Sequence, residues 1–279
     1  MKKIGFIDYY LDEWHANKYP DWIKEASGGE MIVAYAYGKR DADNGLDNAT
    51  WCREKGIQLL DSIESVVEAS DYLIVLSPDH PEQHEELCRL PLQSGKPTYV
   101  DKTFAPDRAT AERLFQWAAE SGTPLFSSSA LRFAAEADTV RREGIDTIVT
   151  LGPGQYANYS IHQVEQIVAL MGSEAERVMW TGTEATPALH IGFSRGRFAT
   201  IHHFHDCAFQ TSVNYAAGGS ISYKIESNFF GSFISSMVAF FRSGQPPVPQ
   251  EETLTIITVI EYGHKAMKTP HQWLELPRG

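Results

Sequence analysis

Strand-like and helix-like segments alternate along the first 127 residues, and this alternation restricts the possible folds more than any other feature of the chain. The clearest segment is Asp71-Tyr-Leu-Ile-Val-Leu76, a continuous apolar run typical of a strand that is buried on both faces of a parallel sheet. Helix patterns separate it from similar runs. Strands are expected at residues 3–7, 31–37, 57–60, 71–76, 97–100 and 124–127. This order predicts a doubly wound, Rossmann-like parallel sheet.

The pattern changes after residue 127. Consecutive glycine-broken strand patterns fill much of the region between Arg177 and Ser227, and they predict an α+β domain built on a mostly antiparallel sheet. Helices are expected at residues 131–143, 161–171, 229–242 and 252–268. The chain is therefore expected to form two domains, 1–127 and 128–279. A homo-oligomer is also expected, because the open face of such a sheet commonly needs covering.

Composition argues against several classes of partner. The 279 residues carry a formal net charge of −12, whereas nucleic acids and anionic membranes attract clustered lysine and arginine. No apolar run approaches the roughly 20 residues of a membrane helix, and the N-terminus enters a strand without a signal core. The three cysteines are scattered, without disulfide or zinc spacing, so a cytoplasmic protein is expected.

An acid and a lysine, Asp101 and Lys102, follow a short apolar strand that ends at Val100. The carboxyl ends of the strands form the ligand crevice of an open parallel sheet. An amine at that edge lies where a small molecule would bind, and it can donate or accept a proton. The alternative interpretation is a surface lysine at the end of a strand.

The stretch 96–105 resembles the Glu-Lys-Pro signature of the Gfo/Idh/MocA family, the sugar and cyclitol oxidoreductases, although Asp101-Lys102-Thr103 retains only the lysine. The resemblance extends over nearly the whole chain and includes Ser127–Phe133, which leads out of the last strand of the first half. It implies a Rossmann-like dinucleotide-binding domain at 1–127 and an α+β substrate and oligomerisation domain at 128–279. It also implies a small carbohydrate or polyol as substrate.

His162 and Glu165 stand three residues apart in a helical pattern, so they share one face of a helix whose opposite face is apolar. The pair resembles the family's His-x-x-Asp motif, but Val168 and Ala169 occupy the region where the family places its catalytic histidine. We expect Lys102, His162 and Glu165 to converge on one pocket, with Lys102 as proton donor or acceptor, His162 as its partner and Glu165 as an orienting charge. The residues alone favour a structural role for His162.

The glycine-rich loop that family members place after the first strand is absent. Asp8, Tyr10 and Glu13 stand where the three small residues belong. A carboxylate within a few ångströms of a pyrophosphate repels it by about 1 to 4 kcal/mol, depending on the dielectric. A nicotinamide dinucleotide, NAD or NADP, is therefore expected to bind loosely. The alternative is a loop that takes another path and still admits the dinucleotide.

Other residues of the first half are candidates for contact with that dinucleotide. The basic pair Lys39 and Arg40 would suit a 2′-phosphate and so favour NADP, although a basic pair in a loop is usually solvated. The Ser77-Pro78 turn resembles a family turn that lies close to the nicotinamide, and His80 and His84 follow it one turn apart, at a helix start expected to be solvated. The full set of cofactor-side candidates is Asp8, Tyr10, Lys39, Arg40, Ser77, His80 and Asp101.

Histidines and aromatic residues supply the candidates for substrate contact. On a strand, His202 and Asp206 would face one way and His203 and His205 the other. Two histidines on one face need a further ligand to hold a metal, so the histidines are expected to line a polar substrate, without a metal. The substrate-side candidates are Tyr9, Trp14, Tyr159 and His202.

Three functions stay open. The first is an oxidoreductase that transfers a hydride between a nicotinamide cofactor and a sugar or cyclitol, while Lys102 handles the hydroxyl proton. The second is a family member with lost or altered dinucleotide binding, which acts as a lyase, dehydratase or isomerase on an oxidised sugar. The third is a non-catalytic sugar-binding or regulatory protein. The family resemblance favours the first, and the missing glycine loop favours the other two.

Overall fold

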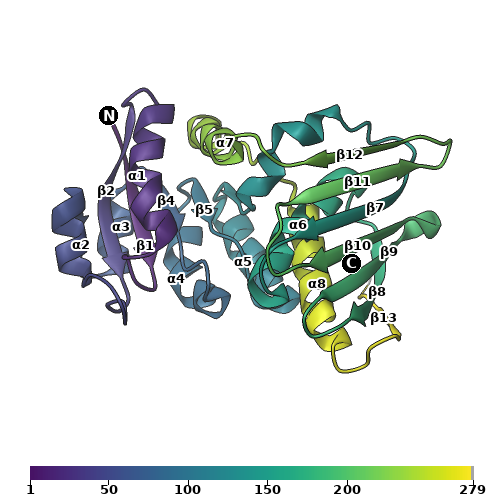
Figure 1. Cartoon of the computed structure of the whole chain (residues 1–279). Helices are drawn as coiled ribbons and strands as arrows, with labels where there is room; N and C mark the ends of the chain where they lie inside the picture. Colours follow the sequence, from purple (N-terminus) through teal and green to yellow (C-terminus); the bar gives the residue numbers. More distant parts are fainter. Residues whose placement is uncertain (278–279) are drawn as a thin grey trace. The chain divides into compact units, whose positions relative to one another are not determined.

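The computed structural model describes residues 1–277, which divide into two compact units (Figure 1). Unit 1 consists of Met1–Ser128 and Gly231–Gln250, and unit 2 consists of Ser129–Phe230 and the described chain from Glu251 onward. The segment 231–250 was expected in the second domain, and the structure corrects this assignment. The reason is a set of aromatic contacts within unit 1.

Unit 1 contains a six-stranded sheet in which neighbouring strands are parallel and follow the order β3-β2-β1-β4-β5-β6. The strands are β1 (Lys2–Asp8), β2 (Met31–Gly38), β3 (Gln58–Leu59), β4 (Tyr72–Val75), β5 (Thr98–Val100) and β6 (Leu125–Phe126). The helices between them are α1 (Trp14–Ala26), α2 (Asn48–Lys55), α3 (Ile63–Ala69), α4 (His84–Leu92) and α5 (Arg108–Ser121). This is the doubly wound sheet that the alternation predicts.

Helix α7 (Phe229–Ser243) completes the core of unit 1 with its aromatic side chains. The ring centroid of Phe233 lies 5.5 Å from that of Tyr99 on β5, and that of Phe240 lies 4.8 Å from Phe126 on β6. Tyr99 and Phe126 are paired neighbours in the sheet, so both rings stand on the face that α7 covers. Large aromatic rings dominate the burial energy of a core, which explains why this late segment packs with the first unit.

Unit 2 is built on a seven-stranded sheet with the order β12-β11-β7-β10-β9-β8-β13. Strands β7 and β10 are parallel and the other neighbours are antiparallel, as predicted for a mostly antiparallel sheet. The strands are β7 (Ile145–Gly152), β8 (Ala175–Gly182), β9 (Pro187–Phe193), β10 (Phe198–His203), β11 (Gln210–Tyr215), β12 (Ser220–Lys224) and β13 (Trp273–Glu275). Helices α6 (Tyr156–Met171) and α8 (Gln250–Ala266) lie on one face of this sheet (Figure 1).

Two local predictions for the second half are wrong. The helix expected at 131–143 is replaced by two 3₁₀ turns, Ala130–Phe133 and Ala135–Thr139. Helix α6 begins at Tyr156, five residues before the predicted start at Ile161, and ends before Gly172 as expected. Within residues 1–277, the helices are too short or too polar to cross a lipid bilayer.

Candidate functional site

The order of the strands in unit 1 reverses between β1 and β4, where the chain passes from one half of the sheet to the other. The crevice outside the carboxyl ends of the strands at such a switch point is where open α/β sheets bind ligands. Asp8 ends β1, Ser77 follows β4, and Asp101 and Lys102 follow β5. The topology therefore brings these predicted site residues to the same edge of the sheet.

Two carboxyl groups are buried at this edge. Asp8 and Asp101 are each 1 % exposed, and the Oδ2 atom of each has no hydrogen-bond partner within residues 1–277. The remaining oxygen of Asp101 accepts a hydrogen bond of 2.7 Å from the Tyr99 hydroxyl. Burial raises the pKa of Asp8 well above its usual range, and the negative charge of Glu13 adds to the effect. An unsatisfied buried carboxyl is costly, which marks this edge as a place where a ligand would be stabilising.

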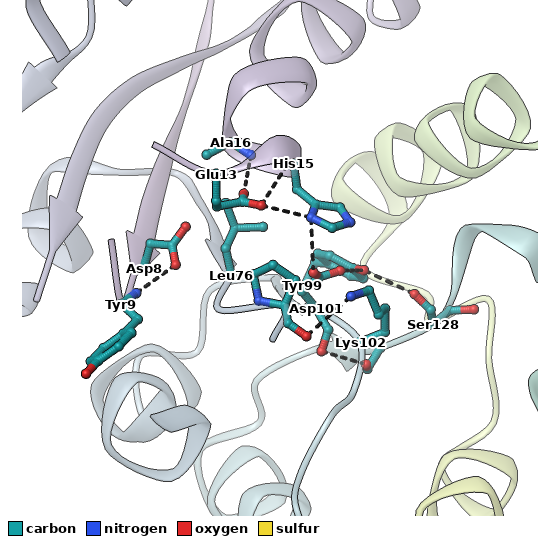
Figure 2. Close-up of polar contacts among 12 residues, drawn as sticks. Asp8, Tyr9, Glu13, His15, Ala16, Leu76, Tyr99, Asp101, Lys102 and Ser128 are labelled. Atoms are coloured by element: carbon teal, nitrogen blue, oxygen red, sulfur yellow. Dashed lines mark hydrogen bonds and ion pairs between the residues drawn. The ribbon is translucent and has the colours of Figure 1, made fainter. Parts of the chain in front are cut away.

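Glu13 and His15 complete the polar cluster, as Figure 2 shows. The Glu13 carboxylate accepts hydrogen bonds from the backbone amides of His15 and Ala16 at the start of α1. The His15 Nδ1 atom lies 3.0 Å from Glu13 Oε2 and 3.9 Å from Asp101 Oδ2. Burial lowers the pKa of His15, but the charges of Asp101 and Glu13 outweigh burial and raise the pKa above its usual value. Sequence reasoning missed His15, whose only signal was its place beside the predicted loop.

Lys102 lies at the edge of this cluster and is 9 % exposed. Its ammonium group donates a hydrogen bond of 3.3 Å to the Pro78 carbonyl, in the turn after β4 (Figure 2 shows the side chain). The peptide bond between Lys102 and Thr103 is cis. One long hydrogen bond to a neutral acceptor leaves most of the ammonium group's donor capacity available, so Lys102 is suited to contact a substrate oxygen.

The basic pair after β2 is hydrogen-bonded to polar side chains of unit 1. Lys39 donates hydrogen bonds to Glu86 Oε2 at 2.7 Å and to Gln83 Oε1 at 2.9 Å. Arg40 bonds the carboxylate of Asp43. A 2′-phosphate would have to compete with these side chains for both cations.

The turn after β4 places its residues in different environments. Ser77 is buried and has a φ of 88°, an uncommon conformation for a residue other than glycine. The His80 ring is 40 % exposed, as predicted, and lies 5.0 Å from the Tyr9 ring and 6.1 Å from the Tyr10 ring. His84 was expected at a solvated helix start, and this is wrong, because its ring is fully buried between the carbonyls of Leu76 and Phe104.

Trp14 is 47 % exposed at the start of α1, and its ring lies 5.1 Å from that of His15. An exposed indole next to a polar cluster is suited to stack on a sugar or a base. Contact of Trp14 with a substrate stays a prediction.

The predicted polar pair of unit 2 is part of a buried network. Glu165 is 2 % exposed, and its Oε1 atom accepts a hydrogen bond of 3.0 Å from Arg132. Arg132 also bonds the carboxylate of Glu252. Burial lowers the pKa of Arg132, but the charges of Glu165 and Glu252 outweigh burial and raise it. The His162 Nδ1 atom lies 2.7 Å from Ser129 Oγ. Arg132 and Glu252 were not singled out from the sequence, since only folding brings them to Glu165.

The histidines near the end of β10 do not lie as the strand pattern predicted. The strand ends at His203, so His205 and Asp206 do not continue its alternation, and the shared face of His202 and Asp206 is wrong. His203 lies on the α6 face, with its ring 5.8 Å from that of Tyr156, and His202 therefore points to the other face. Tyr159 on α6 is 40 % exposed, with its ring 5.4 Å from that of His162. The structure thus separates His202 from the pair on α6.

Within the described chain, histidine, cysteine, aspartate and glutamate side chains form no group of three that could hold a metal ion. A nicotinamide dinucleotide, which the family resemblance implies, would place its pyrophosphate at the N-terminus of α1. The Glu13 carboxylate is bonded to the amides of that helix terminus. The pyrophosphate group does not fit the loop in this arrangement.

Comparison with solved structures identifies the fold. The chain aligns with GenD2 of gentamicin A biosynthesis, solved in complex with NAD, at a TM-score of 0.81 and 11% identity over 100% of this chain and 97% of the other. It aligns with the WlbA dehydrogenase of Bordetella pertussis, solved with NADH and UDP-GlcNAcA, at a TM-score of 0.76 and 13% identity over 99% of each chain. The scyllo-inositol dehydrogenase of Lactobacillus casei gives a TM-score of 0.75 and 14% identity over 98% of each chain.

No protein-family model matches the chain, and no curated protein matches it by sequence. The chain is therefore similar to these proteins in structure, at sequence identities of 11% to 14%, and each alignment covers at least 97% of both chains. This similarity agrees with the resemblance found in the sequence motifs around Lys102 and His162. This chain has the fold of the Gfo/Idh/MocA-type dehydrogenases.

Proposed function

We propose that the chain is an oxidoreductase that transfers a hydride between a sugar or cyclitol and a nicotinamide dinucleotide. The observation that carries the proposal is Lys102, a largely buried lysine at the carboxyl end of β5 with one long hydrogen bond to a carbonyl. It lies at the edge where this fold binds ligands. The fold itself supports the reaction class by analogy, since the matched structures include inositol and sugar-nucleotide dehydrogenases.

The residues of the chain supply proton chemistry in this proposal. A bound nicotinamide would give or accept the hydride. Lys102 would hold or accept the proton of the substrate hydroxyl, with His162 as its partner and Glu165 as an orienting charge. His15 lies beside Asp101, and its ring, which is 13 % exposed, would bond a further hydroxyl of a polyol.

A second function is favoured by one specific observation. The helix terminus that would bind the pyrophosphate is bonded to Glu13. A chain that binds no dinucleotide would still have Lys102 and the buried carboxyls for proton transfer, as a lyase, dehydratase or isomerase of an oxidised sugar. A sugar-binding protein without catalysis is the third possibility, and it predicts binding without turnover.

Two measurements separate these functions. The chain is titrated with NADH and with NADPH while the nicotinamide fluorescence is followed, and it is then incubated with a panel of sugars, cyclitols and their oxidised forms. The oxidoreductase predicts dinucleotide binding and substrate-dependent change of the nicotinamide absorbance. Conversion of an oxidised sugar without any dinucleotide would identify the second function, and sugar binding without conversion would identify the third.

We also propose that the chain forms a homo-oligomer through the face of the unit 2 sheet opposite α6 and α8. Val149 and Trp273 are 36 % and 37 % exposed there, and the Trp273 ring lies 6.1 Å from that of Phe198. Exposed apolar side chains on an open sheet face are suited to pack against a second copy of the chain. Light scattering at micromolar concentration is the test, and a monomer would contradict this proposal.

A further inference from the structure

The start of α1 is capped by a residue that seldom has this role. Aspartate, asparagine, serine and threonine are the usual N-cap residues, because their short side chains reach the free amides of the first turn. In unit 1, Asp47, Ser62 and Asp107 cap α2, α3 and α5 in this way, each accepting from one backbone amide. Glu13 caps α1 instead, and both of its carboxylate oxygens accept from backbone amides, one from His15 and one from Ala16.

Other amides of the same loop are also bonded to side chains. The Tyr9 amide donates to Asp8 Oδ1 at 2.7 Å, and the Leu11 amide donates to Asn48 Oδ1 at 3.1 Å. Asn48 is 7 % exposed and donates in turn to the Arg40 carbonyl at 2.8 Å, which fixes its orientation. In a glycine-rich phosphate loop such amides stay available for the pyrophosphate. Here side chains of the chain itself accept from them.

The Glu13 carboxylate is held in place by more than the helix terminus. Its side chain is 7 % exposed, and Oε2 lies 3.0 Å from the Nδ1 atom of the His15 ring, which is 13 % exposed. A carboxylate that accepts several hydrogen bonds in a buried site competes strongly with another anion for the same donors, since charge-assisted hydrogen bonds are the strong ones.

We propose that the Glu13 carboxylate is an internal anion in the pyrophosphate subsite, and that a dinucleotide binds only by displacing it. This inference rests on the proposed function, because it assumes that a dinucleotide enters the crevice at α1. It goes beyond simple repulsion: the amide donors must first be released from Glu13. Ligands without phosphate groups, such as a free sugar or cyclitol, need no such release.

The test compares Glu13→Ala with wild type and with Asp107→Ala. The control variant removes the same charge and also an N-cap, because Asp107 accepts from the Thr110 amide at the start of α5. It therefore matches Glu13→Ala in lost charge and lost capping. The readout is the dissociation constant for NADH and for NADPH, measured by calorimetry and by nicotinamide fluorescence, without any turnover.

Glu13→Ala is expected to bind both dinucleotides at least about tenfold more tightly than wild type, with Asp107→Ala unchanged. Equal affinity in Glu13→Ala and wild type would overturn the inference while leaving the proposed function intact. An equal gain in Asp107→Ala would also overturn it, since the gain would then come from net charge. Absence of binding in every variant would overturn both proposals. Tighter binding without hydride transfer to any substrate would support the inference and count against the oxidoreductase.

Glu13→Gln covers the case in which Glu13→Ala does not fold. The amide oxygen of glutamine can still accept from one backbone amide of α1, but it lacks the charge that strengthens both hydrogen bonds. This variant is expected to bind dinucleotides more tightly than wild type and less tightly than Glu13→Ala. Affinity equal to or weaker than that of wild type would refute the displacement mechanism.

Discussion

The two units use their buried acids in different ways. In unit 1, Asp8 and Asp101 are buried at the carboxyl edge of the sheet, and each keeps one oxygen without a hydrogen-bond partner within the described chain. In unit 2, Glu165 is buried to the same degree but is bonded to Arg132, which Glu252 also contacts. An acid whose charge is met by a fixed arginine contributes to the structure, whereas an acid left unsatisfied costs stability until a ligand meets it. The contrast shows that the Glu165 carboxylate is paired with an arginine of its own unit, which supports a structural role for it.

The largest effect is expected from Lys102→Met. If the crevice of unit 1 carries the chemistry, losing this proton-transfer group lowers the turnover rate about 10² to 10⁴-fold. The thermal midpoint should change little, because the ammonium group makes one long hydrogen bond. Steady-state kinetics and thermal unfolding of the same preparation check both parts.

Lys96→Met is the matched control, because Lys96 is a lysine at the other end of the same strand. Its ammonium group bonds the carbonyls of Val67 and Ser70 at the C-terminal end of α3, so its loss should lower stability and leave turnover per folded molecule unchanged. Full activity in Lys102→Met would show that Lys102 is not the proton-transfer group.

Arg132→Met is expected to have the largest effect on stability. It leaves the carboxylates of Glu165 and Glu252 buried without their cation, and breaking a buried ion pair from one side costs about 3 to 5 kcal/mol. Urea unfolding measures the loss. Arg113→Met serves as a control, since the Arg113–Glu85 pair is exposed and such pairs contribute about 0 to 1 kcal/mol. Equal losses in the two variants would show that the Arg132 network is not the structural element inferred here.

The stability of Asp8→Asn relative to that of wild type is expected to increase as the pH rises. Burial raises the pKa of Asp8 in the folded chain, so between the usual aspartate value and this raised pKa the folded state binds more protons than the unfolded state. Wild-type stability therefore falls through that window, by at most about 1.4 kcal/mol per pH unit, and asparagine removes this dependence. The difference is obtained from thermal unfolding midpoints of wild type and variant, measured at intervals of about one pH unit from about pH 4 to about pH 8.

Asp71→Asn provides a control of opposite sign. Burial acts to raise the pKa of Asp71, but the hydrogen bonds from Lys2 and the Lys3 amide outweigh burial and lower it, so ionised Asp71 stabilises the fold at neutral pH. Relative to wild type, this variant should lose stability as the pH rises from the lowered pKa of Asp71 to the usual aspartate value, and the difference should stay constant above that value, so its midpoints are measured from about pH 2 to about pH 5. The same slope in both variants would mean that Asp8 is not the unsatisfied acid described above.

The smallest effect is expected from Glu136→Gln in unit 2. Burial acts to raise the pKa of Glu136, but hydrogen bonds from Ser227 and from the amides of Glu226 and Ser227 outweigh it and lower the pKa to about 2. Its contribution is complete above the usual glutamate pKa and is lost as the pH falls toward 2. Because Glu136 is partly exposed, the loss in the variant at neutral pH should be about 1 kcal/mol. Unfolding curves near pH 3 and near pH 7 check that the loss is smaller at the lower pH.

The sequence predicted the sheet of unit 1 well because its central strands, such as β4 and β5, are buried. Runs such as 71–76 are then apolar without interruption, and the capping acid before α5 and the left-handed Gly122 after it mark the helix between them. The helix predicted at 131–143 is wrong because a contact far along the sequence decides the local structure. The alanines and acids of this region suit a helix, but the chain forms 3₁₀ turns there, with Glu136 bonded to the distant Ser227.

The candidate site was predicted in part. Residues that follow strands, such as Asp8 and Lys102, were found because the topology alone puts strand ends together. The double hydrogen bond of Glu13 and the charged contacts of His15 depend on side-chain conformation, which sequence patterns do not encode. Arg132 and Glu252 are 120 residues apart, and only the packed unit brings them to Glu165. Whether Lys102, His162 and Glu165 act on one substrate stays a prediction.

The return of residues 231–250 to unit 1 has a consequence for how the protein is made. The aromatic side chains Phe233 and Phe240 cover rings of β5 and β6, yet they are synthesised long after those strands. Ribosomes add about 5 to 20 residues per second, so the stretch between Ser128 and Gly231 delays completion of the first core by about 5 to 20 seconds. During that time Tyr99 and Phe126 have no native cover from α7. The nascent first half is thus expected to depend on chaperones, and a fragment ending at residue 128 should aggregate rather than fold alone.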